Sequence, residues 1–192
     1  MGNSYLGNAG VFLVQPIFGL ILLAIMFRFL LQIVRADFRN PVGSFLIKVT
    51  DPLLKPLRRY IPGFGGIDMA SIVLLMIVQG IELVLIGLII GQVPAFTAIL
   101  LISFAKLLGL LINVFIFSIL IQVVLSWISP GSYNPITGVL YSLNEPLLSR
   151  ARRIIPAVSG FDLSPIVVMV FLQLISMLVV APIGDMAGVT GH

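Results

Sequence analysis

The segment RRIIPAVSGFDLSPIV at residues 152–167 repeats, without a gap, the segment RRYIPGFGGIDMASIV at residues 58–73. The two lie 94 residues apart, and the match extends upstream to Asn-Pro pairs that begin at Asn40 and Asn134. Proline, glycine, arginine and aspartate recur at the same places, which chance similarity between apolar segments does not produce. Internal repetition of this kind indicates an architecture of two copies of one unit.

The composition of the chain is that of a membrane protein. Of its 192 residues, 59% are hydrophobic and only 9% are charged, whereas a soluble domain carries roughly 25% charged residues. Four apolar stretches are long enough to cross a hydrocarbon core about 30 Å thick. Each is expected to be a helix, because backbone groups in lipid must satisfy one another. The expected spans are residues 11–34, 69–90, 105–128 and 165–183.

These spans predict an all-α membrane protein with four transmembrane helices, arranged as two parallel helix–amphipathic loop–helix repeats. The repeats cover residues 11–91 and 105–183, with short tails at 1–10 and 184–192. Residues 96–104 are interpreted as an interfacial or re-entrant segment that leads into the third span. The N-terminal tail has no basic residue, and no small-residue cleavage site is followed by a polar stretch. The first span is therefore expected to be retained rather than removed as a signal peptide.

Basic residues are concentrated in the two long loops. Residues 35–68 carry six of the eleven lysines and arginines and residues 129–162 carry three, whereas the linker at 91–95 carries none. Because Lys and Arg mark the cytoplasmic side of a membrane, both long loops are expected to be cytoplasmic and both termini extracytoplasmic. The net charge of +4 does not predict nucleic-acid binding, since no basic platform with interleaved aromatic residues is present.

The run R-R-x-I-P-x-x-x-G-x-D before a transmembrane segment, present twice, resembles the repeat of the YggT family. The second copy follows the family pattern through Leu-Ser-Pro at residues 163–165, whereas the first has Met-Ala-Ser at residues 69–71. The resemblance covers roughly residues 11–183 and implies a multi-pass protein of the bacterial inner membrane. Members of the family have been linked to osmotic tolerance and ion uptake, to envelope or nucleoid organisation and, in plastids, to cytochrome maturation. The resemblance therefore implies a family rather than a single activity.

Each long loop is expected to be helical and to lie in the membrane interface. Apolar residues recur at helical spacing over residues 42–57 and 136–154, and such a stripe lies flat against a bilayer. The two Asn-Pro pairs are typical helix starts. Proline within each segment is expected to divide it into two short helices. The expected breaks are at Pro52 and Pro146, with Thr50 and Asn144 as caps of the helices that follow.

The repeated motif follows the amphipathic segment in each copy. Arginines at the end of a helix suit the helix dipole and can face anionic lipid headgroups. Two interpretations stay open for them: a positive-inside anchor that sets the topology, or a docking site for lipid or protein. The aspartate is expected to cap the returning span, where an arginine of the pair can also bind it. The motif residues are Arg58, Arg59, Pro62, Gly66 and Asp68 in the first copy and Arg152, Arg153, Pro156, Gly160 and Asp162 in the second.

Polar residues within the spans form a second candidate site, because ionisable groups at membrane depth are expensive. Arg28 is expected to reach Gln79 and Glu82 between the first two spans. Lys106 is expected to snorkel to the outer interface, or to be a weaker partner of Glu82. The group is interpreted as a structural pair or, alternatively, as part of an ion or proton path. With its counterparts 94 residues on, the predicted cluster comprises Arg28, Gln79, Glu82, Gln122 and Gln173.

The sequence does not indicate an enzyme, since it has no nucleophile–base pair, metal cluster or phosphate-binding glycine loop. Cysteine is absent and the single histidine is the terminal His192, so no metal or cofactor is predicted. The favoured function is a non-enzymatic scaffold or assembly factor that contacts membrane lipids and unidentified proteins through its basic loops. The alternative is a small channel or transporter, although the spans hold few polar groups. Four short helices make a thin bundle, which is compatible with a homo-oligomer.

Overall fold

The computed structural model describes residues 2–128, 134–155 and 162–186. All the elements in these ranges are helices. In chain order they are α1 (Gly2–Ile33), α2 (Pro41–Tyr60), α3 (Met69–Ile90), α4 (Phe96–Ile128), α5 (Pro135–Ile154), α6 (Ser164–Ile175), the π-helical segment η1 (Ser176–Val180) and α7 (Ala181–Met186).

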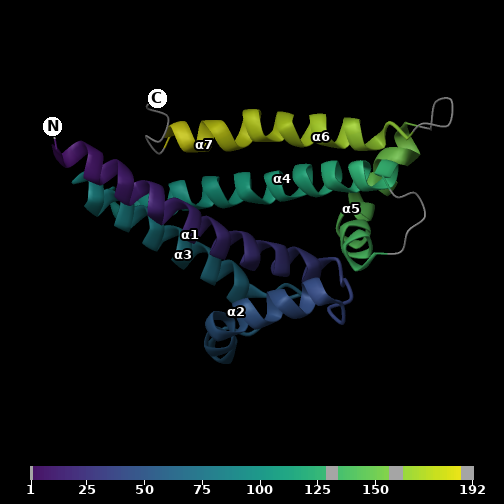
Figure 1. Ribbon diagram of the computed structural model, residues 1–192, viewed down its shortest axis with the longest axis horizontal. Coiled ribbons are helices and arrows are strands. Elements are labelled where there is room, and N and C mark those ends of the chain that lie inside the picture. The colour runs from purple at the N-terminus through teal and green to yellow at the C-terminus, as the bar shows by residue number, and fades with distance from the viewer. Residues whose placement is uncertain (1, 129–133, 156–161, 187–192) are drawn as a thin grey trace.

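Four helices are long and apolar enough to cross a membrane, as the sequence predicted. The candidate spans are Tyr5–Ile33, Met69–Ile90, Phe96–Ile128 and Ser164–Met186. The fourth span consists of α6, η1 and α7, which follow one another without a gap. Each repeat is a hairpin of two spans joined by an amphipathic helix. Figure 1 shows α2 and α5 on one side of the molecule and the start of α1 and helix α7 on the other, and α2 contacts α5. The two hairpins therefore point in the same direction.

The amphipathic helices are continuous, so the predicted breaks at Pro52 and Pro146 are wrong. A proline inside a helix removes one backbone hydrogen bond and displaces the carbonyl four residues earlier. Pro52, Pro56 and Pro146 all lie on exposed sides of their helices. The carbonyl groups that lose their partners are therefore not in the protein core, and each helix continues past its proline.

The predicted helix starts are confirmed, since the Asn40 side chain accepts a hydrogen bond from the Gly43 amide at 2.8 Å.

The predicted re-entrant form of residues 96–104 is wrong, whereas their position in the membrane interface stays a prediction. Helix α4 runs without interruption through these residues, because no proline occurs between Pro94 and the end of the helix. At 1.5 Å per residue its 33 residues extend roughly 50 Å, which exceeds a hydrocarbon core of about 30 Å. The helix must tilt or project beyond the core. Helix α1 likewise begins at Gly2, so much of the predicted N-terminal tail is helical.

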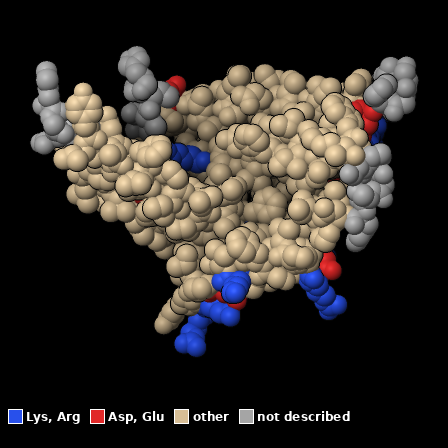
Figure 2. Space-filling view, in the orientation of Figure 1, with Lys and Arg blue, Asp and Glu red and all other residues tan. Residues whose placement is uncertain are grey.

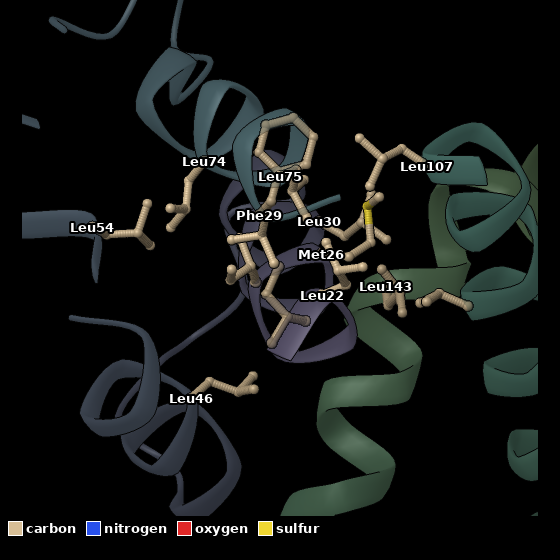
Figure 3. Close-up of a cluster of buried hydrophobic side chains, with 14 of the residues drawn as sticks. Leu22, Met26, Phe29, Leu30, Leu46, Leu54, Leu74, Leu75, Leu107 and Leu143 are labelled. Carbon is tan, nitrogen blue, oxygen red and sulfur yellow. The ribbon is translucent and has the colours of Figure 1, made fainter. Parts of the chain in front are cut away.

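A single apolar core joins the two repeats. Most of its buried residues come from the first repeat, but α4 and α5 contribute Leu107, Val114, Val139 and Leu143. Figure 3 shows Leu143 of α5 and Leu107 of α4 in the same cluster as Met26 of α1. A smaller core lies within the second repeat, between α4, α5 and α6. The second repeat therefore packs on the first through the faces of α4 and α5.

Candidate functional site

The repeated motif forms a closed corner at the base of α3. Arg58, at the end of α2, donates hydrogen bonds to Asp68 Oδ2 from Nη2 at 2.5 Å and from Nε at 3.1 Å. The Ser71 hydroxyl donates to the same oxygen at 2.6 Å, and Arg58 also reaches Gln32 Oε1 at 3.3 Å. Burial raises the pKa of Asp68, but hydrogen bonds from Arg58 and Ser71 outweigh it and hold the pKa below its ordinary value.

The second repeat builds the same corner in a more exposed setting. Arg152 Nε donates to Asp162 Oδ2 at 2.8 Å, and its Nη1 donates to Glu145 Oε1 at 3.0 Å. The Ser164 amide donates to Asp162 Oδ1 at 2.9 Å. Burial raises the pKa of Asp162, and the bonds from Ser164 and Arg152 lower it below the ordinary value. The predicted arginine–aspartate pairing is thus present in both repeats.

Neither aspartate makes the predicted capping bond from the cap position of its span. Asp68 occupies the cap position of α3, but its side chain makes no capping bond to the backbone because Arg58 and Ser71 occupy it. Asp162 lies one residue before the cap position of α6, which is Leu163, and accepts the backbone amide of Ser164. The turn of the first corner includes Gly66, whose φ of 83° is a left-handed conformation that suits glycine. Pro156 and Gly160 lie outside the described residues.

The two arginines of each pair have different roles. Arg58 and Arg152 are bound to the corner aspartates. Arg59 and Arg153 are exposed, and within the described part of the chain neither has a carboxylate within 4 Å. The first arginine therefore stabilises the corner, and the second is available to the surroundings.

Arg28 does not reach Gln79 or Glu82, so the predicted intramembrane cluster is wrong at this point. Arg28 Nη1 instead lies 2.8 Å from Asp51 Oδ1 and 2.6 Å from Thr50 Oγ1, both on α2. Depth explains the difference. At 1.5 Å per residue, Arg28 lies roughly 8 Å and Glu82 roughly 20 Å from the ends of their helices near α2.

Asp51 is shared between a buried and an exposed cation. Lys55 Nζ lies 2.9 Å from Asp51 Oδ2, one helical turn away on α2. The hydrogen bond from Lys55 lowers the pKa of Asp51, and the bond from Arg28 adds to this effect against the opposing effect of burial. The interaction joins the first span to the middle of its amphipathic helix.

The second repeat makes the same junction with neutral groups. Asn144, which corresponds to Thr50, is fully buried and donates from Nδ2 to Gln122 Oε1 at 2.8 Å. The Ser118 hydroxyl donates to Asn144 Oδ1 at 2.6 Å. The prediction that Thr50 and Asn144 cap broken helices is therefore wrong. Thr50 instead binds α2 to α1, and Asn144 binds α5 to α4. The sequence carried a signal for this junction, because Arg28 and Thr50 are replaced together by Gln122 and Asn144.

Gln79 and Glu82 lie at a separate place in the bundle. Both are buried, and Gln79 Nε2 donates to Glu82 Oε2 at 2.5 Å. They line a cavity of about 420 Å³ between α1, α3, α4 and α7, which Lys106 and Asn113 also line. The prediction that Lys106 snorkels away is therefore not supported, and among the described residues it forms no ion pair with Glu82 within 4 Å.

Gln173 lies outside all of these groups, exposed on α6. The predicted five-residue cluster is thus divided among three buried places and one exposed helix face. The cavity was not predicted, and Asn113 gave no warning of it, since its counterpart in the first repeat is Gly19.

Comparison with known proteins is decisive on the family. A family model described as CCB3/YggT matches the chain twice, over residues 7–89 and 101–183. The chain belongs to the CCB3/YggT family. The two YggT segments are offset by the same 94 residues as the motif, and each covers most of one hairpin.

Similar YggT-family proteins cover nearly the whole chain. The uncharacterized protein PA0392 of Pseudomonas aeruginosa is 45% identical over 185 residues, which are 95% of this chain and 94% of that protein. An uncharacterized protein of Vibrio alginolyticus is 36% identical over 94% of this chain and 96% of its own length. The uncharacterized protein YggT of Escherichia coli K12 is 35% identical, with 88% of each chain covered. No solved structure matches the chain.

Proposed function

We propose that this YggT-family protein is a non-enzymatic scaffold of the bacterial inner membrane, which binds anionic lipid headgroups and assembles partner proteins beside them. The binding surface is the basic rim, defined as Arg59, Arg150 and Arg153 at the C-terminal ends of α2 and α5. Both long loops would then be cytoplasmic, where anionic lipids attract basic side chains.

The observation that supports this proposal is that one arginine of each pair binds the corner aspartate while the other is exposed. In both repeats an exposed arginine is followed by an exposed apolar residue: Arg59 by Tyr60, which is 81% exposed, and Arg153 by Ile154, which is 80% exposed. An arginine beside an apolar side chain fits the boundary between headgroups and acyl chains. A basic residue that served only to balance a carboxylate would have no need of this neighbour.

The fold places one basic site in each repeat, on the side of the bundle where the amphipathic helices lie. Helices α2 and α5 contact each other, and residues from 36–41 and 135–142 line one pocket where the two helices begin. Their basic C-terminal ends lie apart, each beside the start of its own returning span. Figure 2 shows lysine and arginine side chains at the lower edge of the molecule, where α2 lies, below a surface that is largely uncharged. The corner bonds hold the end of each amphipathic helix to the base of a span, so each basic site is fixed relative to its own repeat.

Lipid binding is tested on the full chain in zwitterionic nanodiscs, titrated with phosphatidylglycerol and followed by the midpoint of thermal unfolding. Anionic lipid is expected to raise the midpoint of the native chain. Arg59→Glu with Arg153→Glu is expected to abolish the rise, since each basic residue near an anionic surface is worth about 1 kcal/mol. The matched variant Arg59→Lys with Arg153→Lys retains the charge and is expected to retain the rise. An equal rise in all three chains would overturn the proposal.

The intramembrane cavity favours a second candidate, transport of an ion or small polar solute. Glu82 and Lys106 place both signs of charge in one hollow within the spans, which is the arrangement expected of an intramembrane binding site. Purified protein in liposomes distinguishes the two functions. A scaffold leaves fluxes of protons, sodium and potassium unchanged, and Glu82→Gln is then nearly silent. A flux that Glu82→Gln abolishes would establish transport instead.

A further inference from the structure

The 94-residue register allows each position of one repeat to be compared with its counterpart in the other. Where the second repeat packs on the first, Leu107 of α4 is 8% exposed and Leu143 of α5 is fully buried. Their counterparts on the first repeat are Leu13 of α1, which is 63% exposed, and Val49 of α2, which is 44% exposed. The face with which the second repeat docks is thus also present on the first repeat, where nothing in the described chain covers it.

The receiving face is duplicated in the same way. Met26 of α1, which belongs to the same buried cluster as Leu107 and Leu143, is 3% exposed, whereas its counterpart Leu120 of α4 is 46% exposed. One chain therefore carries a used docking face and a used receiving face, together with an unused copy of each.

Two glutamines show that lipid is a poor cover for the unused faces. Gln79 of α3 and Gly109 of α4 line the same cavity between the repeats. Their counterparts are Gln173 of α6 and Gln15 of α1, and both are exposed on helices that span the membrane. An amide in contact with lipid loses its hydrogen-bond partners, whereas glutamines that meet between helices can bond to each other.

We propose that two copies of this chain associate head to tail, with the first repeat of one copy docked on the second repeat of the other as the repeats dock within one chain. Val49 and Leu13 of one copy then cover Leu120 of its partner, and Gln15 meets Gln173. Each copy offers one unused docking face and one unused receiving face, so the contact joins two different surfaces and is heterologous. A closed assembly covers all of these faces, and the smallest closed assembly is a dimer.

Disulfide crosslinking of the full chain in native membranes tests this contact, because the chain has no cysteine of its own. Val49→Cys with Leu120→Cys is expected to give a disulfide-linked dimer as the main oxidised product. Within the described chain α2 does not contact α4, so this bridge has to form between copies. Met26→Cys with Leu143→Cys, the equivalent pair, is expected to bridge within one chain and shows that the oxidation works.

Ile77→Cys with Leu120→Cys is the matched control. Ile77 of α3 and its counterpart Phe171 are exposed in both repeats, so this position faces lipid whichever repeat carries it. Gln173→Leu in the Val49→Cys, Leu120→Cys chain is expected to lower the dimer yield at least several-fold. If lipid covers these faces, the dimer yield of Val49→Cys, Leu120→Cys will be no higher than that of the Ile77→Cys, Leu120→Cys control. If the two copies meet through a different contact, Gln173→Leu will leave the dimer yield unchanged. Either result overturns the proposal.

Discussion

The two repeats share one backbone plan but hold it together differently. The first uses charged groups, with Arg28 bound to Asp51 and a buried Asp68 bound to Arg58. The second uses the neutral Gln122 and Asn144 at one junction and an exposed ion pair at the other. A charge that is removed from water needs a partner, whereas an exposed pair contributes little. The first repeat is therefore the one in which single substitutions should destabilise most.

The largest difference between the repeats is expected at the corner aspartates. Asp68→Asn replaces a buried carboxylate and leaves the half-buried Arg58 without its charged partner, so it is expected to destabilise the fold by about 2–4 kcal/mol. Asp162→Asn removes an exposed pair and is expected to destabilise it by less than about 1 kcal/mol. Thermal unfolding of the purified variants in detergent measures both. Equal losses would show that burial does not separate the two corners.

The junctions provide the next comparison. Arg28→Gln removes the buried partner of Asp51 but leaves Lys55, so a loss of about 1–3 kcal/mol is expected. Adding Thr50→Asn reproduces the side-chain pair of the second repeat and is expected to recover about half of that loss. Thermal unfolding in detergent measures the stability of both variants. If the double variant is no more stable than Arg28→Gln alone, the neutral junction of the second repeat depends on Ser118 or on other neighbours.

Glycines near the start of the amphipathic helices give a smaller contrast. A Cβ on Gly43 would lie 2.7 Å from the Phe38 Cα atom, whereas a Cβ on Gly138 would meet nothing within 4 Å. Gly43→Ala is expected to lower stability by about 1–2 kcal/mol through backbone displacement. Gly138→Ala is expected to be neutral or stabilising by a few tenths of a kcal/mol, since alanine favours helix. Circular dichroism melts of the two variants test this, and a reversed order would contradict the close approach of α2 to the preceding loop.

Acidification should act mainly through the first repeat, with the smallest effect of the four. The folded-state pKa of Asp68 lies below its ordinary value of 3.8, so its contribution to stability is complete above about pH 4 and is lost as the pH falls through the folded-state pKa. Asp51 follows the same rule. Unfolding midpoints measured from pH 7 to pH 3 are expected to fall less steeply for Asp68→Asn than for the native chain. Asp162→Asn should change the profile less, because solvent already screens that pair.

The architecture could be predicted from the sequence because it depends on properties that act along the chain. The length and apolarity of each stretch give the number of spans, and the 94-residue repeat gives two hairpins of one direction. The arginine–aspartate corner was also within reach, since its residues lie 10 apart on either side of one turn. The breaks predicted at the prolines failed because a proline on an exposed side of a helix leaves its unpaired carbonyl outside the core.

The sequence by itself determined that the protein is embedded in a membrane, that it has four spans in two repeats, and that an arginine–aspartate corner ends each amphipathic helix. Only the tertiary structure decided that Arg28 binds α2 rather than Glu82, that one arginine of each pair is exposed, and that equal faces of the two repeats differ in burial. The physical reason is that apolar length and local spacing are properties of the chain, whereas the partner of a side chain depends on depth in the bundle and on which neighbour packs beside it.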